Sequence, residues 1–93
     1  MYHLQVITPE KVIYDNKVTS IIAPGTDGYL GVLTDHAPLI ATLGKGVFII
    51  TRQGKEKYFY KITGGFLEVN NNEVAVLVDS LEETTPHDMG GGI

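Results

Sequence analysis

The residues best able to do chemistry in this chain are few and widely separated. Its only serines are Ser20 and Ser80, and neither occupies the Gly-x-Ser-x-Gly pattern that exposes a nucleophile on a sharp turn. The histidines His3, His36 and His87 are not spaced as the ligands of a zinc site. The carboxylates are scattered, so spacing identifies no acid–base pair. We therefore predict no catalytic residues and no metal site.

Phosphate and nucleic-acid chemistry are equally poorly supported. The Gly44-Lys45-Gly46 segment resembles a phosphate loop in part, but it lacks the earlier glycine, the Ser or Thr after the lysine, and a following helix. The net charge of −4 disfavours nucleic acid, which requires a basic excess. The absence of cysteine excludes disulfides and thiolate chemistry. The sequence therefore predicts a protein that is not an enzyme and binds no cofactor.

Three side chains remain as candidates for a protein–protein interface. His36 lies in an Asp-His-Ala-Pro turn, where its ring can bond a local carbonyl or contact a partner, and spacing favours the local role. Tyr29 either caps the core or forms an exposed aromatic anchor, and spacing leaves both open. Phe59 lies between lysines whose aliphatic stems can cover it.

The elements that must position these residues are β-strands. Helical periodicity is absent over any window of twelve residues or more, and short alternating or apolar runs recur between turn residues. We expect about nine or ten short strands that form an antiparallel β-sandwich or flattened barrel, an all-β fold. The clearest expected strands cover residues 2–8, 12–14, 17–23, 29–33, 39–43, 47–52, 55–63, 66–69 and 74–78.

Several local features of these strands carry specific expectations. Asp15-Asn16 is a predicted turn. In the strand at 17–23 the inward set is either Val18 with Ile22 or Ile21 with Ala23. The strand at 47–52 is apolar on both faces, which predicts cover on both sides. Gly64-Gly65 predicts a bulge or a close approach between backbones.

The strand pattern ends after Leu81. Residues 1–81 are therefore expected to form one domain, and residues 82–93 a flexible acidic and Gly-rich tail.

Four collinear segments between residues 2 and 80 carry a family resemblance: YHLQVITPE (2–10), APGTDGYLGVLTDHAPL (23–39), GGFLEV (64–69) and VAVLVDS (74–80). Together they resemble the β-sandwich domain of the epsilon subunit of F-type ATP synthases, whose mitochondrial counterpart is called delta. The resemblance implies a ten-stranded sandwich in the central stalk. It implies a non-catalytic subunit that links gamma to the c-ring and couples rotation, driven by proton flow, to ATP synthesis.

The resemblance also implies a location and contact residues. The protein would be peripheral, without membrane insertion, on the inner (cytoplasmic) face of a bacterial energy-transducing membrane. Asp27, Gly28, Tyr29, Leu30 and Gly31 match the turn that faces the c-ring, and His36, Ala37, Pro38 and Leu39 match the segment near gamma. Family members often have an acidic residue at the position of Tyr29 and a glycine at the position of Asp35. Aspartate is tolerable there if φ is positive.

The chain ends at Ile93, so the C-terminal helical hairpin of many family members is expected to be absent, and with it inhibition of ATP hydrolysis by that hairpin. An alternative class is a lipoyl- or biotinyl-type carrier domain, also a small β-sandwich. It requires a modifiable lysine, typically in Met-Lys-Met or Asp-Lys-Ala, and Gly54-Lys55-Glu56 is a poor substitute. A sugar-binding sandwich is disfavoured because the chain lacks tryptophan.

Overall fold

The computed structural model describes residues 1–85, which form ten β-strands and no helix. His87 and most of the predicted tail lie outside the described residues. The strands are β1 (Tyr2–Ile7), β2 (Val12–Val18), β3 (Ser20–Gly25), β4 (Gly28–Leu33), β5 (Leu39–Leu43), β6 (Gly46–Thr51), β7 (Lys57–Ile62), β8 (Gly65–Asn70), β9 (Glu73–Val78) and β10 (Glu82–Thr84).

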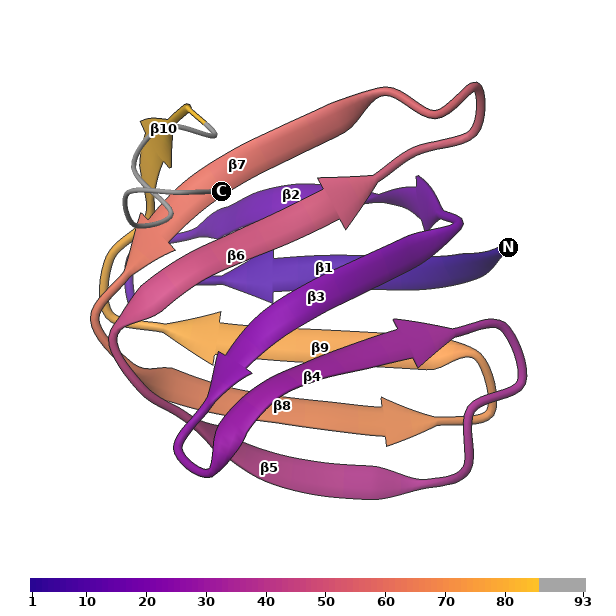
Figure 1. Cartoon of the computed structure of the whole chain (residues 1–93), viewed down its shortest axis with the longest axis horizontal. Helices are drawn as coiled ribbons and strands as arrows, with labels where there is room; N and C mark the ends of the chain where they lie inside the picture. Colours follow the sequence, from indigo (N-terminus) through magenta and orange to yellow (C-terminus); the bar gives the residue numbers. More distant parts are fainter. Residues whose placement is uncertain (86–93) are drawn as a thin grey trace.

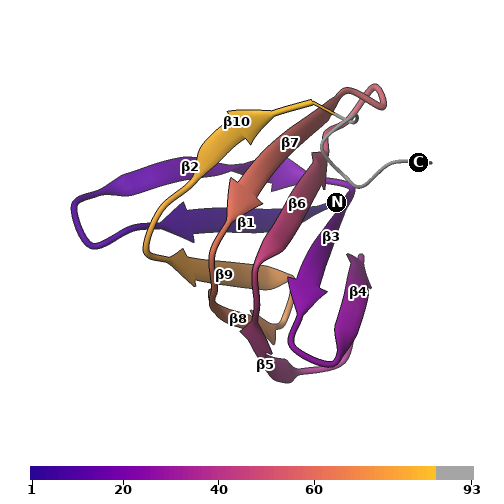
Figure 2. The same cartoon turned by 60° about the vertical axis from the view of Figure 1, so that its left-hand side comes forward.

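One continuous sheet curls into two layers (Figure 1). Strands β10, β7, β6, β3 and β4 form one layer, and β5, β8, β9, β1 and β2 form the other. The layers join where Gly25 of β3 pairs with Leu43 of β5, and β5 leads through a short turn into β6 of the opposite layer (Figure 2). The prediction of an all-β sandwich or flattened barrel is confirmed.

The sheet departs from a purely antiparallel arrangement at β1. This strand pairs antiparallel with β2 on one side and parallel with β9 on the other, whereas the other ladders of the described sheet are antiparallel. A parallel pair needs a long connection between its strands, and here that connection is the chain from β2 to β8. Strand alternation cannot reveal it, because the side-chain period is the same in both directions.

The predicted turn at Asp15-Asn16 is wrong. Strand β2 continues through both residues, and Gln5 pairs with Asp15 and Leu4 with Asn16. β2 ends the described strand order, so its polar side chains can remain in solvent while the backbone extends. The chain bends instead at Thr19, whose N–H donates to the Thr51 carbonyl at 2.9 Å.

The core fills the space between the two layers with alternate residues of each strand. In β3 the inward residues are Ile21 and Ala23, which resolves the ambiguity in the sequence, while Ile22 is 40% exposed. The prediction that the strand at 47–52 is covered on both sides is confirmed in β6, because Val47, Phe48, Ile49 and Ile50 are all buried. The fully buried side chains of greatest volume are Phe48, Leu4, Ile21, Ile50, Ile62 and Leu67.

Gly65 lies where three strands approach closely, as the Gly-Gly pair predicted. It pairs with Leu43 of β5 and with Val78 of β9. A methyl group built on its Cα would overlap the Leu77 carbonyl oxygen. Only glycine fits this position without displacement of β9.

Strand β10 was not predicted as a strand, because residues 82–84 show no alternation of apolar residues. They pair with Lys61, Tyr60 and Phe59 of β7. The strand is therefore fixed by backbone bonds to the edge of a layer rather than by a buried face of its own.

Candidate partner-binding surfaces

The segment expected to face the c-ring starts at the β3–β4 hairpin. Gly25 pairs with Gly28 and leaves Thr26 and Asp27 in the turn. Asp27, Gly28, Tyr29 and Gly31 are exposed, whereas the Leu30 side chain packs against the core. The five residues therefore do not form one surface, because alternation turns Leu30 inward.

Tyr29 combines an exposed ring with an internal hydrogen bond. Its side chain is 55% exposed, and its hydroxyl accepts a hydrogen bond from the Val47 N–H at 3.1 Å. The neighbouring Pro24 turns its carbonyl to the Gly44 N–H at 2.7 Å, so the Tyr29 hydroxyl serves as the partner of Val47 where β3 diverges from β6. The Tyr29 side chain is thus exposed at the surface and also links β4 to β6 through its hydroxyl.

Gly46 makes room for this arrangement. A methyl group at Gly46 would lie 2.8 Å from the Tyr29 hydroxyl oxygen and 2.7 Å from Pro24 Cβ. Both contacts are too close for carbon, so the absence of a side chain at this position allows the ring to cross β3.

The segment expected to face gamma follows β4. The His36 N–H donates to the Leu33 carbonyl at 3.2 Å, and His36 Nδ1–H donates to the Ala37 carbonyl at 2.7 Å. This hydrogen bond from the His36 ring to a nearby carbonyl is the role that the sequence favoured for His36. Ala37 and Pro38 are exposed, and Leu39 packs partly against the core.

Asp35, which precedes this segment, has φ = 65°. The expectation that a positive φ would make aspartate tolerable at this position therefore holds.

The two expected contact segments lie at opposite ends of the sandwich. Figure 1 shows the β3–β4 turn at the left-hand end and the connection between β4 and β5 at the right-hand end. Since β4 runs the length between them, the segment at 27–31 and the segment at 36–39 are brought to separate surfaces. Phe59, the third aromatic candidate, is half-buried opposite Ile49.

Exposed apolar side chains on the outer face of β5, β8 and β9 were not predicted. Ile40, Phe66 and Leu77 are 76%, 57% and 46% exposed. Phe66 and Leu77 are paired across β8 and β9, and they border an apolar hollow of about 550 Å³ that reaches Ile7. The available signal was an apolar residue on the outward phase of each strand, where a solvated sheet face carries polar ones.

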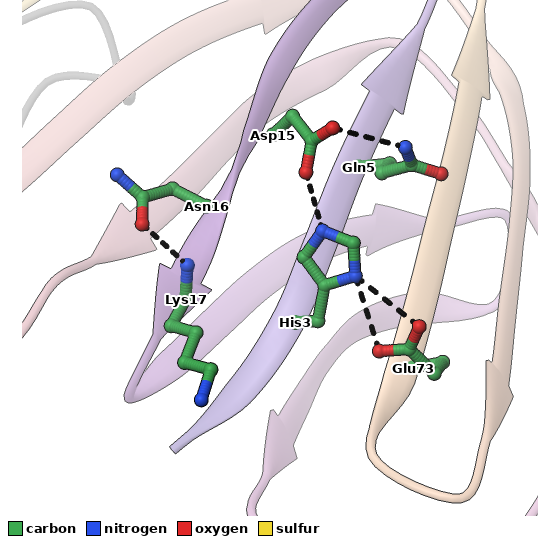
Figure 3. Close-up of polar contacts among 6 residues, drawn as sticks. All are labelled: His3, Gln5, Asp15, Asn16, Lys17 and Glu73. Carbon is green, nitrogen blue, oxygen red and sulfur yellow. Dashed lines mark hydrogen bonds and ion pairs between the residues drawn. The ribbon is translucent and has the colours of Figure 1, made fainter.

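The same outer face carries a charged cluster around His3 (Figure 3). His3 Nε2 contacts an Asp15 carboxylate oxygen, and Nδ1 lies 3.1 Å from Glu73 Oε2. Gln5 donates to the other Asp15 oxygen at 3.2 Å. His3 on β1 thus links this strand to β2 through Asp15 and to β9 through Glu73. No local sequence pattern predicts these contacts, because the partners are distant from His3 in the sequence.

The contacts of His3 shift two pKa values. Hydrogen bonds to Asp15, first, and to Glu73 raise the pKa of His3 above its ordinary value of 6.5. The hydrogen bond from His3 lowers the pKa of Asp15. Lys17 lies opposite His3 in the register, and Glu68 lines a surface hollow together with His3 and Glu73. The neighbouring carboxylates therefore favour the protonated ring more than water does.

We expect the stabilisation from His3 to depend on pH. Because its pKa is higher in the folded state, the contribution is complete below pH 6.5 and is lost as the pH rises through the folded value. The urea midpoint of the wild type should exceed that of His3→Gln by more at about pH 5.5 than at about pH 8.5. Asp15 stays ionised at both values because its pKa is lowered. An equal difference at both pH values would contradict the expectation.

Within residues 1–85, no group of His, Cys, Asp or Glu side chains is arranged to hold a metal ion. The same residues contain no helix that is long and apolar enough to cross a membrane.

Comparison with known proteins identifies the family. Residues 1–84 match the family model described as the ATP synthase delta/epsilon chain, β-sandwich domain. Proteins named ATP synthase epsilon chain are 46% identical over 77 residues in Leptospira borgpetersenii, 49% over 79 residues in Prochloron didemni and 47% over 85 residues in Synechocystis sp.. These matches cover 83%, 85% and 91% of this chain but only 60%, 57% and 62% of those relatives.

Two solved ATP synthase structures contain chains with the same fold. A chain in the cryo-EM structure of the Euglena gracilis mitochondrial ATP synthase (OSCP/F1/c-ring) superposes with a TM-score of 0.82 and 26% identity, over 86% of this chain and 51% of that one. A chain of the Tetrahymena thermophila mitochondrial ATP synthase central stalk and c-ring has a TM-score of 0.75 at 18% identity, over 98% of this chain and 75% of that one, and supports the fold. The chain therefore belongs to the ATP synthase delta/epsilon family, as its β-sandwich domain.

Proposed function

We propose that this chain is a non-catalytic subunit of the central stalk of an F-type ATP synthase, where it links gamma to the c-ring and couples proton-driven rotation to ATP synthesis. The observation that carries the proposal is the family match over residues 1–84. The carrier-domain alternative has no comparable support. The proposed location is peripheral, on the inner (cytoplasmic) face of a bacterial energy-transducing membrane.

The proposed gamma surface combines the predicted segment with the exposed side chain that follows it. His36, Ala37, Pro38 and Leu39 lead directly into Ile40, the most exposed of the large apolar side chains within residues 1–85. Phe66 and Leu77 lie on the same outer face but nearer the β3–β4 turn, since Thr26 lines the same hollow as both of them. Aromatic and aliphatic anchors at the centre of an interface contribute most of its binding energy, so this face suits an extended partner.

The proposed c-ring surface lies at the opposite end, at the β3–β4 hairpin and Tyr29. Transmission of torque between two surfaces requires that the body between them resist deformation. Here every strand of the described sheet is bonded to a neighbour, and the core between the layers is filled by large buried side chains. The fold is thus suited to a coupling role.

Substitution of Ile40 by aspartate tests the gamma surface. We expect Ile40→Asp to weaken the capture of gamma by the tagged chain from detergent-solubilised native membranes by at least about tenfold, because the charge would be desolvated in the interface. The matched control is Ile22→Asp, which places the same change on the outer face of the other layer. Failure of the wild-type chain to capture gamma would refute the proposed function. Equal losses in the two variants would refute the placement of the surface.

A further inference from the structure

Two side chains close a cyclic hydrogen-bonded pair at the end of the sandwich that carries residues 36–39. The Asp35 N–H donates to Asn72 Oδ1 at 2.7 Å, and Asn72 Nδ2–H donates to Asp35 Oδ1 at 2.8 Å. Asp35 follows β4, and Asn72 lies in the turn between β8 and β9. The pair therefore joins a connection that leaves one layer to a turn of the other layer.

Both residues adopt the left-handed backbone conformation, with φ values of 65° for Asp35 and 60° for Asn72. Aspartate and asparagine are among the few non-glycine residues that tolerate it. The residue types thus satisfy two requirements, the backbone conformation and the reciprocal hydrogen bonds. A glycine at residue 35 would keep the conformation and its own N–H bond but lose the bond from Asn72 Nδ2, and a glycine at residue 72 would lose both bonds.

The Asn72 end of this pair is itself anchored. Its carbonyl accepts a hydrogen bond from the His3 N–H at 3.0 Å, and the next residue, Glu73, contacts the His3 ring. Asn72 is therefore fixed to β1, an interior strand of its layer. Through Asn72, the start of the connection after β4 is fixed to the same strand.

We propose that Asp35 and Asn72 are positioning residues that set the direction in which residues 36–39 leave β4, and so hold the gamma-facing segment ready for its partner. This inference rests on the proposed function. Beyond Asp35, the connection has only the local bonds of His36 before β5 begins at Leu39. Loss of the pair frees this segment, and binding must then order it again at a cost in affinity.

Substitutions at Asp35 separate backbone conformation from hydrogen bonding. Asp35→Gly keeps the positive φ and removes the side chain, whereas Asp35→Asn keeps an oxygen that accepts from Asn72. The purified full chain is titrated into the gamma-containing catalytic sector prepared without it, at a temperature where circular dichroism shows every variant folded. We expect about tenfold weaker binding for Asp35→Gly and for Asn72→Gly, and binding within about twofold of wild type for Asp35→Asn.

Two further measurements distinguish positioning from general loss of stability. The double variant with glycine at both positions should bind no more weakly than Asn72→Gly, because that single substitution already removes both hydrogen bonds of the pair. Amide hydrogen exchange at His36 and Ala37 should accelerate in Asp35→Gly, while that of the core strands stays unchanged. The matched control is Asn71→Gly, which changes the adjacent turn residue, also at positive φ.

The outcomes are decisive. If the wild type binds and Asp35→Gly binds equally well, or if Asp35→Asn is as weak as Asp35→Gly, the positioning role is wrong while the proposed function stands. Additive losses in the double variant would also overturn it, because the two residues would then act independently. If the wild type itself does not bind, the proposed function fails and the inference fails with it.

Discussion

Substitution of Gly65 by alanine is expected to destabilise the domain by about 3–5 kcal/mol, the sum of overpacking and backbone strain. The new methyl group would overlap the Leu77 carbonyl oxygen and lie 3.0 Å from Val78 Cγ1. The φ of Gly65 is also 156°, a conformation that side chains disfavour. Because β8 lies between β5 and β9, it cannot move away from one neighbour without disturbing the other.

Two other glycines serve as controls for this experiment. Gly54 has φ = 90° and open space around its Cα, so Gly54→Ala isolates strain and should cost about 1–2 kcal/mol. A methyl group at Gly31 would lie at an ordinary 3.9 Å from the Ile21 carbonyl oxygen, so Gly31→Ala should be close to neutral. Urea denaturation measures all three. If Gly65→Ala lowers the free energy of unfolding by no more than Gly54→Ala, β8 and β9 move apart at little cost and the predicted overlap is wrong.

Truncation of Phe48 to alanine should cost about 3–5 kcal/mol through lost burial and the cavity left behind. Phe48 is fully buried at the centre of β6, between the strands β3 and β7. A domain of this size has a total stability of about 5–10 kcal/mol, so the variant should unfold near physiological temperature.

The matched control is Phe66→Ala, which removes the same group from a side chain that is 57% exposed. Its loss should remain below about 1 kcal/mol, because little apolar area leaves water there on folding. Calorimetry of both variants tests the distinction. Similar losses at the two positions would place Phe48 outside the core, or show that Phe66 is covered in the isolated domain.

Local alternation was a sound guide wherever a strand has one buried face. In β7 the residues Tyr58, Tyr60 and Ile62 face the core, in keeping with period-two alternation along the predicted strand at 55–63, and the observed bounds of β5 are those expected from its apolar run. Turn propensity was a poorer guide. Asp15-Asn16 extends as a strand because its backbone pairs with β1 and its Asp15 carboxylate bonds His3 and Gln5.

For the candidate surfaces, too, the sequence located some features and missed others. The glycine and proline pattern between residues 23 and 39 located the hairpin and the connection after β4, and resemblance assigned them to partners. It did not show that Leu30 packs against the core, nor that Phe66 and Leu77 are exposed neighbours on adjacent strands. The sequence of a single strand shows which of its residues point outward. Which of these residues form one surface depends on which strands are neighbours in the sheet.

By itself, the sequence determined the all-β class and the family, and it predicted a bulge or a close approach between backbones at Gly64-Gly65. These follow from period-two alternation, from the space that a residue type occupies, and from motifs read in order. Only the tertiary structure decided that β1 lies between β2 and β9, and that His3 meets Glu73 and Asp35 meets Asn72. These contacts join residues far apart in the chain, and their geometry is set by strand order and register, which no local pattern encodes.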